Sequence, residues 1–458
     1  MSGAVLARTA TLGAGASAGA GAHAGASAGA SVTAGAAAGA PLDLARIRAD
    51  FPILARQING RPLVYLDSAA SAQCPTAVLQ AVDHYRTSLH ANVHRGVHSL
   101  SQWATQAYEL ARERVRRFLN ARSTREIVFV RGTTEAINLV ANSYGRTHLS
   151  DGDEVLITYL EHHANIVPWQ LACAASGARL RAAPVLDDGQ LDLSAFEALL
   201  TPRTRLVAVA HVSNALGTLL PVQRIVQLAH ARGVPVLLDG AQAVAHAPVD
   251  VQALDCDFYA FSGHKIYGPT GIGVLYGRES LLAAMPPWQG GGDMILSVSI
   301  EHTTFNELPW KFEAGTPPIA EAVGLGAAVE YLDGLGMERV REHERELTGL
   351  LLDGLAQVPG VRVVGPPEAD SRGGLVSFTV EGIHPHDVAE LVSREGVCIR
   401  AGHHCAQPLM RCLGVTATAR ASVGVYNEPA DVEALLAALH GAREVFALEG
   451  SAAAAQVG

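Results

Sequence analysis

The 458-residue chain has little cysteine, and that shortage limits what it can be. Its six cysteines include no Cys-x-x-Cys pair. Thiols this few and this widely spaced exclude a small secreted fold stapled by disulfides. The cysteine content therefore indicates a reducing cytoplasm, where a single reactive thiol persists.

Charged residues and long apolar runs are also scarce. Charged residues make up 17% of the chain, and the formal net charge is -10. An acidic chain lacks the basic face that displaces counterions, so non-specific nucleic-acid binding is disfavoured. No apolar run approaches the length of a membrane span, so we expect a soluble protein without a membrane anchor.

The first 40 residues contain almost nothing but small side chains. They are nearly all Ala, Gly, Ser and Thr, with Arg8 as their one charged residue. Such a segment has little apolar bulk to bury, so we predict a disordered tail over 1–40. A targeting peptide is the alternative, but the segment has neither a sustained apolar run nor several arginines.

From Pro41 to about residue 280, short apolar runs alternate with longer amphipathic stretches. Helical spacing is seen at Gln106–Leu119 and at Leu219–Ala231, where Pro221 falls in the first turn. Five runs are predicted as buried strands: Ile127–Val130, Glu154–Thr158, Leu206–Ala210, Val234–Leu238 and Phe258–Phe261. This alternation predicts an α/β fold with a mostly parallel sheet flanked by helices. Ligands of such sheets bind beyond the carboxyl ends of the strands.

Residues from about 330 onward have a different pattern. Helices are predicted over Met337–Leu352 and Pro385–Glu395, and strands over Leu375–Val380 and Val397–Arg400. We predict a smaller α+β domain that closes over the first. The predicted division is a segment 41–60 packing with the small domain, a large cofactor-binding domain 61–330, a small domain 331–448 and a flexible tail 449–458.

Two polar clusters directly follow predicted strands. They are Asp239-Gly-Ala-Gln242 and Ser262-Gly-His264-Lys265. Alone, Asp239 is equally well explained by a turn or a helix cap, and Lys265 by a surface turn. A lysine after a buried strand is nevertheless unusual, because a buried ammonium is costly unless it is paired or neutralised. Together they supply the Schiff-base lysine and the partner of a pyridinium nitrogen that pyridoxal phosphate requires.

A phosphate site is then expected nearby. Residues Arg131–Asn138 follow a predicted strand and open a helix, whose free N–H groups and dipole favour a phosphate. The hydroxyl groups of Thr133 or Thr134 are further donors, as are Ser262 and His264. Simple helix capping explains the same residues and remains open.

Histidines form a third cluster, Glu161–Asn165, after the strand Glu154–Thr158. A flat imidazole at this place can stack on a pyridine ring and relay protons. Structural histidines or half of a metal site are the alternatives. Neighbours such as His162 and His163 rarely bind one ion together.

The fourth cluster surrounds a cysteine in a loop after the last predicted strand. Cys405 is preceded by His403 and His404, which can lower the pKa of a thiol. Arg400 and Arg420 are candidates for a fork that binds a carboxylate, because guanidinium pairs with carboxylate through two hydrogen bonds.

A metal site is the rival interpretation of this cluster. Cys398, Cys405 and Cys412 recur every seven residues beside two histidines. Spacings of seven do not match compact zinc signatures, and Cys398 is expected to point into the core. We therefore predict no metal.

These clusters resemble those of the SufS-type (group II) cysteine desulfurases, which are class V, fold-type I pyridoxal-phosphate enzymes. The resemblance extends from about Leu44 to about Leu448. It rests on stretches in the family's order: Tyr65–Ser71, His94–Gly96, Val130–Thr134, Glu161–Trp169, His211–Asn214, Asp239–Ala243, Phe261–Lys265 and Arg400–Met410. It implies a fold-type I aminotransferase-like large domain and a homodimer.

The resemblance also implies a role for each matched residue. The catalytic residues it implies are Lys265 as the Schiff-base lysine, His162 stacked on the ring and Cys405 as the sulfur acceptor. The remaining cofactor contacts it implies are Asp239 with the ring nitrogen, Gln242 with the ring hydroxyl, and Thr134, Ser262, His264 and the other subunit's Thr316 with the phosphate. The substrate-binding residues are Asn214, Arg420 and, as a fork candidate, Arg400.

The implied activity converts L-cysteine to L-alanine and leaves a persulfide on Cys405, which a Suf-type acceptor protein removes for iron–sulfur cluster assembly. A selenocysteine lyase on the same scaffold is the closest alternative, because selenium leaves more readily and needs no Cys405. Another class V reaction, such as an aminotransferase or epimerase, has no need for a loop cysteine. A non-catalytic scaffold would be expected to lose Lys265 or Asp239, and both are present.

Overall fold

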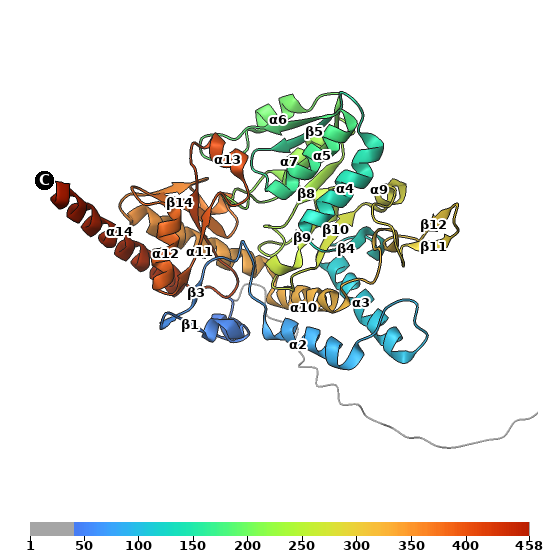
Figure 1. Ribbon diagram of the computed structural model, residues 1–458, viewed down its shortest axis with the longest axis horizontal. Helices are drawn as coiled ribbons and strands as arrows, with labels where there is room; N and C mark the ends of the chain where they lie inside the picture. The colour runs from blue at the N-terminus through green and yellow to red at the C-terminus, as the bar shows by residue number, and fades with distance from the viewer. Residues whose placement is uncertain (1–40, 458) are drawn as a thin grey trace, which may run out of the picture. The chain divides into compact units, whose positions relative to one another are not determined.

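The computed structural model describes residues 41–457, and for 445–457 only the backbone (Figure 1). The predicted tail 1–40 and Gly458 lie outside the described residues. None of the helices in the described part is both long and apolar enough to cross a membrane.

A seven-stranded sheet forms the centre of the larger part, in the order β4-β10-β9-β8-β7-β5-β6. Its strands are β4 (Ile127–Val130), β5 (Glu154–Thr158), β6 (Arg179–Ala183), β7 (Thr204–Ala210), β8 (Val236–Asp239), β9 (Phe258–Ser262) and β10 (Gly273–Gly277). β10 runs antiparallel to both β4 and β9, and the other neighbours are parallel. The predicted α/β class with a mostly parallel sheet is confirmed.

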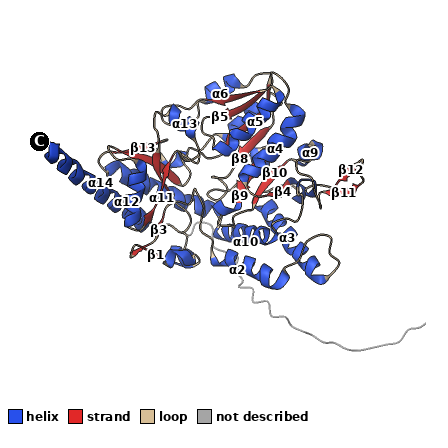
Figure 2. Cartoon of the chain, viewed as in Figure 1, coloured by secondary structure: helices blue, strands red, loops and turns tan. Residues whose placement is uncertain are grey.

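Both faces of this sheet are covered by helices, because successive side chains of a strand point to opposite faces (Figure 2). Ile127 and Phe129 of β4 belong to one core cluster, and Val128 and Val130 belong to the other. The first cluster also holds residues of α3 (Ser99–Phe118), α7 (Val222–His230) and α10 (Ile319–Leu335), and the second holds residues of α4 (Thr133–His148) and α5 (Val167–Ser176).

Predicted ends of elements differ from the observed ones where a cap decides them. The helix predicted from Gln106 begins at Ser99, because the His98 side chain accepts a hydrogen bond from the Ser101 N–H. Pro221 is the residue before α7 and does not lie in its first turn. Proline suits a helix start, because its missing N–H has no partner there in any case.

The smaller part contains a four-stranded sheet in the order β13-β14-β17-β16. Its strands are β13 (Val361–Val364), β14 (Leu375–Val380), β16 (Arg400–Gly402) and β17 (Thr418–Ser422). Its helices are α11 (Met337–Gln357), α12 (Pro385–Arg394), α13 (Gln407–Cys412) and α14 (Pro429–Val457). α14 continues through most of 449–458, where we predicted a tail. The division into domains remains a prediction.

The single strand predicted over Val397–Arg400 is wrong. β15 (Val397–Cys398) pairs in parallel with β3 (Val64–Tyr65), whereas β16 pairs with β17 in another sheet. Val397 takes the core face of β15, so alternation turns Cys398 the other way and leaves it partly exposed. The expectation that Cys398 points into the core is therefore also wrong.

The remaining elements connect or flank these sheets. The remaining helices are α1 (Leu44–Ala49), α2 (Thr76–His84), α6 (Leu193–Leu199), α8 (Val251–Leu254) and α9 (Glu279–Ala284), and the remaining strands are β1 (Gln57–Ile58), β2 (Arg61–Pro62), β11 (Ile295–Val298) and β12 (Thr303–Phe305). Short helical turns cover Pro52–Ala55, Tyr85–Leu89, Thr124–Glu126, His163–Asn165, Gly263–Lys265, Trp310–Phe312 and Ala369–Ser371. Arg48 of α1 forms an ion pair with Asp431 of α14 at 2.9 Å, which ties the start of the described chain to the smaller part.

Candidate active site

A cavity of about 270 Å³ lies where β7, β8 and β9 end at their carboxyl edge. Loops from the smaller part close its other side. All of the site residues predicted from the sequence line this cavity except Thr316. The four polar clusters, which are far apart in the sequence, therefore meet in one place, as the rule for parallel sheets requires.

The floor of the cavity is the end of β8. The Asp239 carboxylate is buried and accepts a hydrogen bond of 3.0 Å from the Ala241 N–H. Burial raises its pKa, and the neighbouring Lys265 ammonium opposes that rise. The Tyr259 ring packs so closely on Gly240 that a Cβ there would lie 2.1 Å from a ring carbon, so only glycine fits after Asp239.

Lys265 ends a single helical turn, Gly263–Lys265, that directly follows β9. Burial lowers the pKa of Lys265 to about 8, with Arg420 acting in the same direction and Asp239 against it. An amine with this pKa is partly neutral near pH 7, and the neutral form is the nucleophile. The turn thus places an activated amine beside a buried carboxylate.

His162 lines the cavity and directly precedes the turn His163–Asn165. Its Nδ1 accepts a hydrogen bond of 3.0 Å from the Ala164 N–H, so the neutral ring carries its proton on Nε2. Burial, followed by the charge of Lys265, lowers the pKa of His162 to about 4. The imidazole is therefore neutral near pH 7.

A buried carboxyl group supports the His162 turn from behind. Glu161 is bonded to Asn165 Nδ2 at 2.7 Å and to Thr158 Oγ1 at 2.5 Å. Burial raises the pKa of Glu161 to about 8, despite these hydrogen bonds. A protonated Glu161 adds no negative charge beside Asp239.

The N-terminus of α4 forms one end of the cavity. The Ser262 hydroxyl accepts from the Thr133 N–H at 2.8 Å and lies 2.7 Å from the Thr133 hydroxyl. Thr133 is buried by these contacts, whereas Thr134 is exposed beside it and lines the cavity. Burial lowers the pKa of the nearby His264 to about 4, so that it is neutral near pH 7.

The cysteine loop also lines the cavity. His404 and Cys405 both have a left-handed backbone, with φ of 50° and 53°, which is strained for residues other than glycine. Cys405 is exposed and lines the cavity. His163 holds the loop at two points. Its backbone N–H donates to the Cys405 carbonyl at 2.7 Å, and its ring Nε2 accepts from the Gln407 backbone N–H at 3.1 Å.

Two arginines line the cavity beside this loop. Arg420 is buried, and its Nη1 donates to the Asn214 carbonyl at 2.7 Å. Asp67 faces both arginines, with its carboxylate 2.9 Å from Arg400 Nη2 and 3.4 Å from Arg420 Nη2. The charge of this cluster is therefore balanced in part before any ligand arrives.

Comparison with known proteins gives this cavity a context. The model of the class-V aminotransferase family matches residues 64–435. The chain belongs to the class-V aminotransferase family. It is 52% identical over 400 residues to a probable cysteine desulfurase of Halalkalibacterium halodurans, an alignment that covers 87% of this chain and 98% of the relative.

Solved structures agree with this family assignment. The cysteine desulfurase CsdA of Escherichia coli superposes with a TM-score of 0.82 at 44% identity, covering 88% of this chain and 99% of that one. A protein named C-DES, solved with glycine covalently linked to its pyridoxal-phosphate cofactor, superposes with a TM-score of 0.73 at 26% identity, covering 86% and 98%. The predicted resemblance to cysteine desulfurases, the enzyme class and the use of pyridoxal phosphate by this family are confirmed.

The residues present in this chain fit the family's cofactor. Among the described residues, three buried polar atoms facing this region have no hydrogen-bond partner: Asn214 Oδ1, His404 Nδ1 and Arg420 Nε. An orphaned buried polar atom is costly, so such atoms mark where a polar ligand belongs. The helix N-terminus, the buried carboxylate and the amine of Lys265 supply the donors and acceptors for a phosphate, a pyridinium and an aldehyde.

Sequence reasoning missed two residues of this class-V site. Asp67, which faces both arginines, lies inside the matched stretch Tyr65–Ser71, but its charge partners are distant in sequence. His163 was noted only as the neighbour of His162, although its ring supports the cysteine loop. Thr316, in contrast, is exposed and lines a second cavity with Arg131 and Glu135, so the chain does not bring it into its own site.

Proposed function

We propose that the protein is a cysteine desulfurase that transfers the sulfur of L-cysteine to Cys405 and releases L-alanine. One observation carries this proposal: an exposed thiol and a half-buried amine line the same cavity although they lie in separate parts of the fold. They belong to Cys405 and Lys265 respectively. An aminotransferase or epimerase has no use for the first of these groups.

Lys265 is proposed to hold the cofactor and to move the Cα proton of the substrate. When bound, pyridoxal phosphate supplies an electron sink for the charge that develops at that carbon. Asp239 would hold the ring nitrogen, and the neutral His162 ring would stack on the cofactor. Thr134, Ser262 and His264 are proposed for the phosphate, and Gln242 for the ring hydroxyl.

The substrate carboxylate is proposed to bind Arg420, whose Nε is buried without a partner among the described residues. Arg400 strengthens the positive charge there, and Asn214 supplies a second polar contact. With the substrate held in this way, its sulfur faces Cys405. The Cys405 thiolate then attacks that sulfur, so that an S–S bond forms, the C–S bond breaks, and the carbon takes up a proton to become the methyl group of alanine.

A homodimer and a sulfur-accepting protein complete the proposal. Thr316 is exposed and lies outside the cavity of its own chain, which is the arrangement expected of a residue that serves a partner's phosphate site. The persulfide forms on an exposed residue, so a Suf-type acceptor can reach it and carry the sulfur to iron–sulfur cluster assembly. A reducing cytoplasm suits such a carrier.

The test is the intact mass of the protein before and after addition of L-cysteine, with alanine assayed in parallel. We expect a gain of one sulfur on Cys405 and a matching amount of alanine. Cys405→Ala should form no persulfide, and Cys412→Ala, which changes another exposed thiol, is the matched control. Sustained turnover of cysteine by Cys405→Ala would refute the assignment, and turnover of selenocysteine alone would indicate a selenocysteine lyase.

The attachment site has a separate test. The chain contains only two lysines, Lys265 and Lys311, so borohydride reduction followed by peptide mapping has few possible outcomes. We expect the cofactor on Lys265, and the Lys265→Ala variant should lose the visible absorption. Labelling of Lys311 would contradict the proposed role of Lys265.

A further inference from the structure

The edge strand of the central sheet is completed by side chains. Among the described strands β4 has one neighbour, β10, so part of its backbone faces away from the sheet. On that side the Ile127 carbonyl accepts from Arg112 Nη1 at 2.8 Å, and the Phe129 N–H donates to Glu313 Oε1 at 2.8 Å. A buried arginine and glutamate thus occupy the place that another strand would take.

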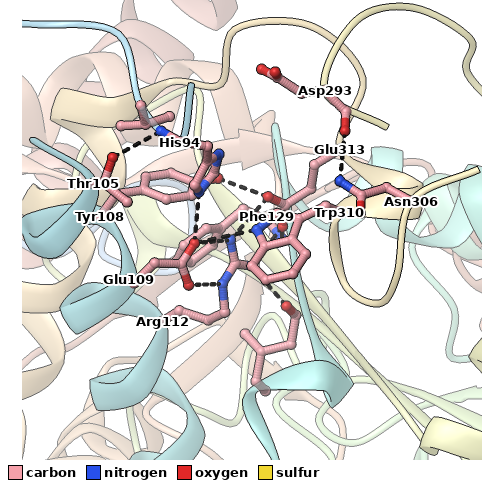
Figure 3. A network of polar contacts seen from close by, with 12 residues as sticks. His94, Thr105, Tyr108, Glu109, Arg112, Phe129, Asp293, Asn306, Trp310 and Glu313 are labelled. Carbon is pink, nitrogen blue, oxygen red and sulfur yellow. Dashed lines mark hydrogen bonds and ion pairs between the residues drawn. The ribbon is translucent and has the colours of Figure 1, made fainter. Parts of the chain in front are cut away.

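These two side chains also bind each other. Arg112 Nη1 and Nη2 donate to the two oxygens of Glu313 at 2.6 and 3.0 Å, and the Tyr108 hydroxyl donates to Glu313 Oε2 at 2.9 Å (Figure 3). The Glu313 carboxylate therefore accepts from three different residues. The three donors thus converge on this one carboxylate, between α3 and the edge of the sheet.

The Arg112 guanidinium is buried among aromatic and acidic side chains. Its side chain is fully buried, and its carbon lies 4.6 Å from the centre of the Phe129 ring. Glu109 accepts from its Nε at 2.9 Å and also lies 3.0 Å from His94 Nε2. Burial alone would raise the pKa of Glu109, but the hydrogen bonds to His94 and Arg112 bring it down to about 2.

The network joins the two segments that the proposed function assigns to phosphate binding. β4 leads through Arg131 directly into Gly132–Thr134 at the start of α4. Glu313 precedes Thr316 by three positions, with Gly315 between them at a φ of 82°, a conformation that favours glycine. The Glu313 carboxylate is therefore hydrogen-bonded to β4, which leads into Gly132–Thr134. Glu313 itself belongs to the loop that carries Thr316.

Resting on the proposed function, we propose that the Arg112–Glu313 pair is a positioning unit for the cofactor phosphate. It fixes the Gly132–Thr134 segment for its own subunit and the Thr316 segment for the partner's site. A buried ion pair contributes little to stability over apolar residues of the same size, but its geometry is strict. A geometric role accounts for an arginine whose donors are all directed at β4 and two carboxylates.

The test compares cofactor-free protein binding pyridoxal phosphate with the same protein binding pyridoxal, which lacks the phosphate. Glu313→Gln keeps the shape but loses the charge, and Tyr108→Phe removes one hydrogen bond as a milder change. The matched control is Arg114→Gln on the same helix α3, which removes a partly exposed ion pair with Glu330 of α10. Half-saturation is read from the change in visible absorption.

We expect Glu313→Gln to raise the half-saturating concentration of pyridoxal phosphate about tenfold, because it breaks the ion pair with Arg112. Tyr108→Phe should raise it about threefold, because it removes one of several hydrogen bonds to Glu313 and leaves the ion pair in place. Pyridoxal binding should change less than about twofold in both variants, and Arg114→Gln should change neither ligand. Equal weakening of both ligands, or of neither, would overturn the positioning role alone. Failure of the unmodified protein to bind pyridoxal phosphate would overturn the proposed function as well.

Discussion

Replacing Lys265 by methionine should stabilise the cofactor-free protein, although it should abolish the proposed activity. Burial lowers the pKa of this lysine from 10.5 to about 8. If the site were fully shielded from water, the charged ammonium would therefore lower the free energy of unfolding by about 3 kcal/mol at neutral pH. Lys265 keeps partial contact with the open cavity, and Asp239 loses a favourable neighbour in the variant, so we expect a net gain of about 1–2 kcal/mol.

The pH dependence of this gain identifies its cause. The folded chain releases the Lys265 proton at about pH 8, whereas the unfolded chain keeps its proton up to 10.5. The penalty is thus complete below about pH 8 and disappears as the pH rises toward 10.5. Lys265→Met should therefore be more stable than the parent near neutral pH, and the two should converge in alkaline solution.

Urea unfolding of the two cofactor-free proteins, at neutral and alkaline pH, measures this difference. The matched control is Lys311→Met, which removes the other lysine of the chain. Lys311 Nζ donates to the carbonyls of Leu282 and Ala283 at 3.1 and 2.9 Å, so its loss should destabilise by about 1 kcal/mol. A Lys265→Met protein no more stable than its parent, or one whose advantage is equal at both pH values, would refute the reasoning.

Three further predictions concern the surroundings of the cavity. In urea unfolding, Glu161→Gln should become increasingly more stable than the parent as the pH rises from about 4.5 toward 8, because the parent's Glu161 stays protonated when folded but ionises on unfolding. A difference in unfolding free energy that stays constant over this range would show that Glu161 is ionised when folded. Asp67→Asn should lower the unfolding free energy by about 1–2 kcal/mol, because buried Arg420 loses a charged partner, and an unchanged urea midpoint would contradict that pairing. His163→Leu should slow persulfide formation about tenfold with the cofactor absorption unchanged, because Gln407 N–H loses its acceptor; in rapid-quench assays, an unchanged rate would mean that the cysteine loop holds its shape without His163.

Much of the site was predictable because each cluster directly follows a strand that the apolar pattern reveals. Asp239 and Lys265 come after β8 and β9, and in a parallel sheet the carboxyl ends of neighbouring strands meet. Cys405 was identifiable by its histidine neighbours and by resemblance to the family. Asp67 was not, because nothing near it in the sequence shows that Arg400 and Arg420 will face it.

The smaller part was predicted less well for a related reason. The run Val397–Arg400 has one apolar pattern but serves two sheets, since β15 pairs with β3 from the beginning of the chain and β16 pairs with β17 near its end. Which strand a short run joins depends on partners that are remote in sequence. The exposure of Cys398 follows from that choice.

The amino-acid sequence by itself determined the class of fold, the strand ends that carry chemistry, and the identities of the lysine, aspartate and cysteine in the site. These follow from local periodicity and from residue types at fixed positions after strands. Only the tertiary structure decided that Arg112 and Glu313 complete the edge of β4 and that His163 supports the cysteine loop. Buried polar groups must find partners wherever the fold brings them, and those partners lie far apart along the chain.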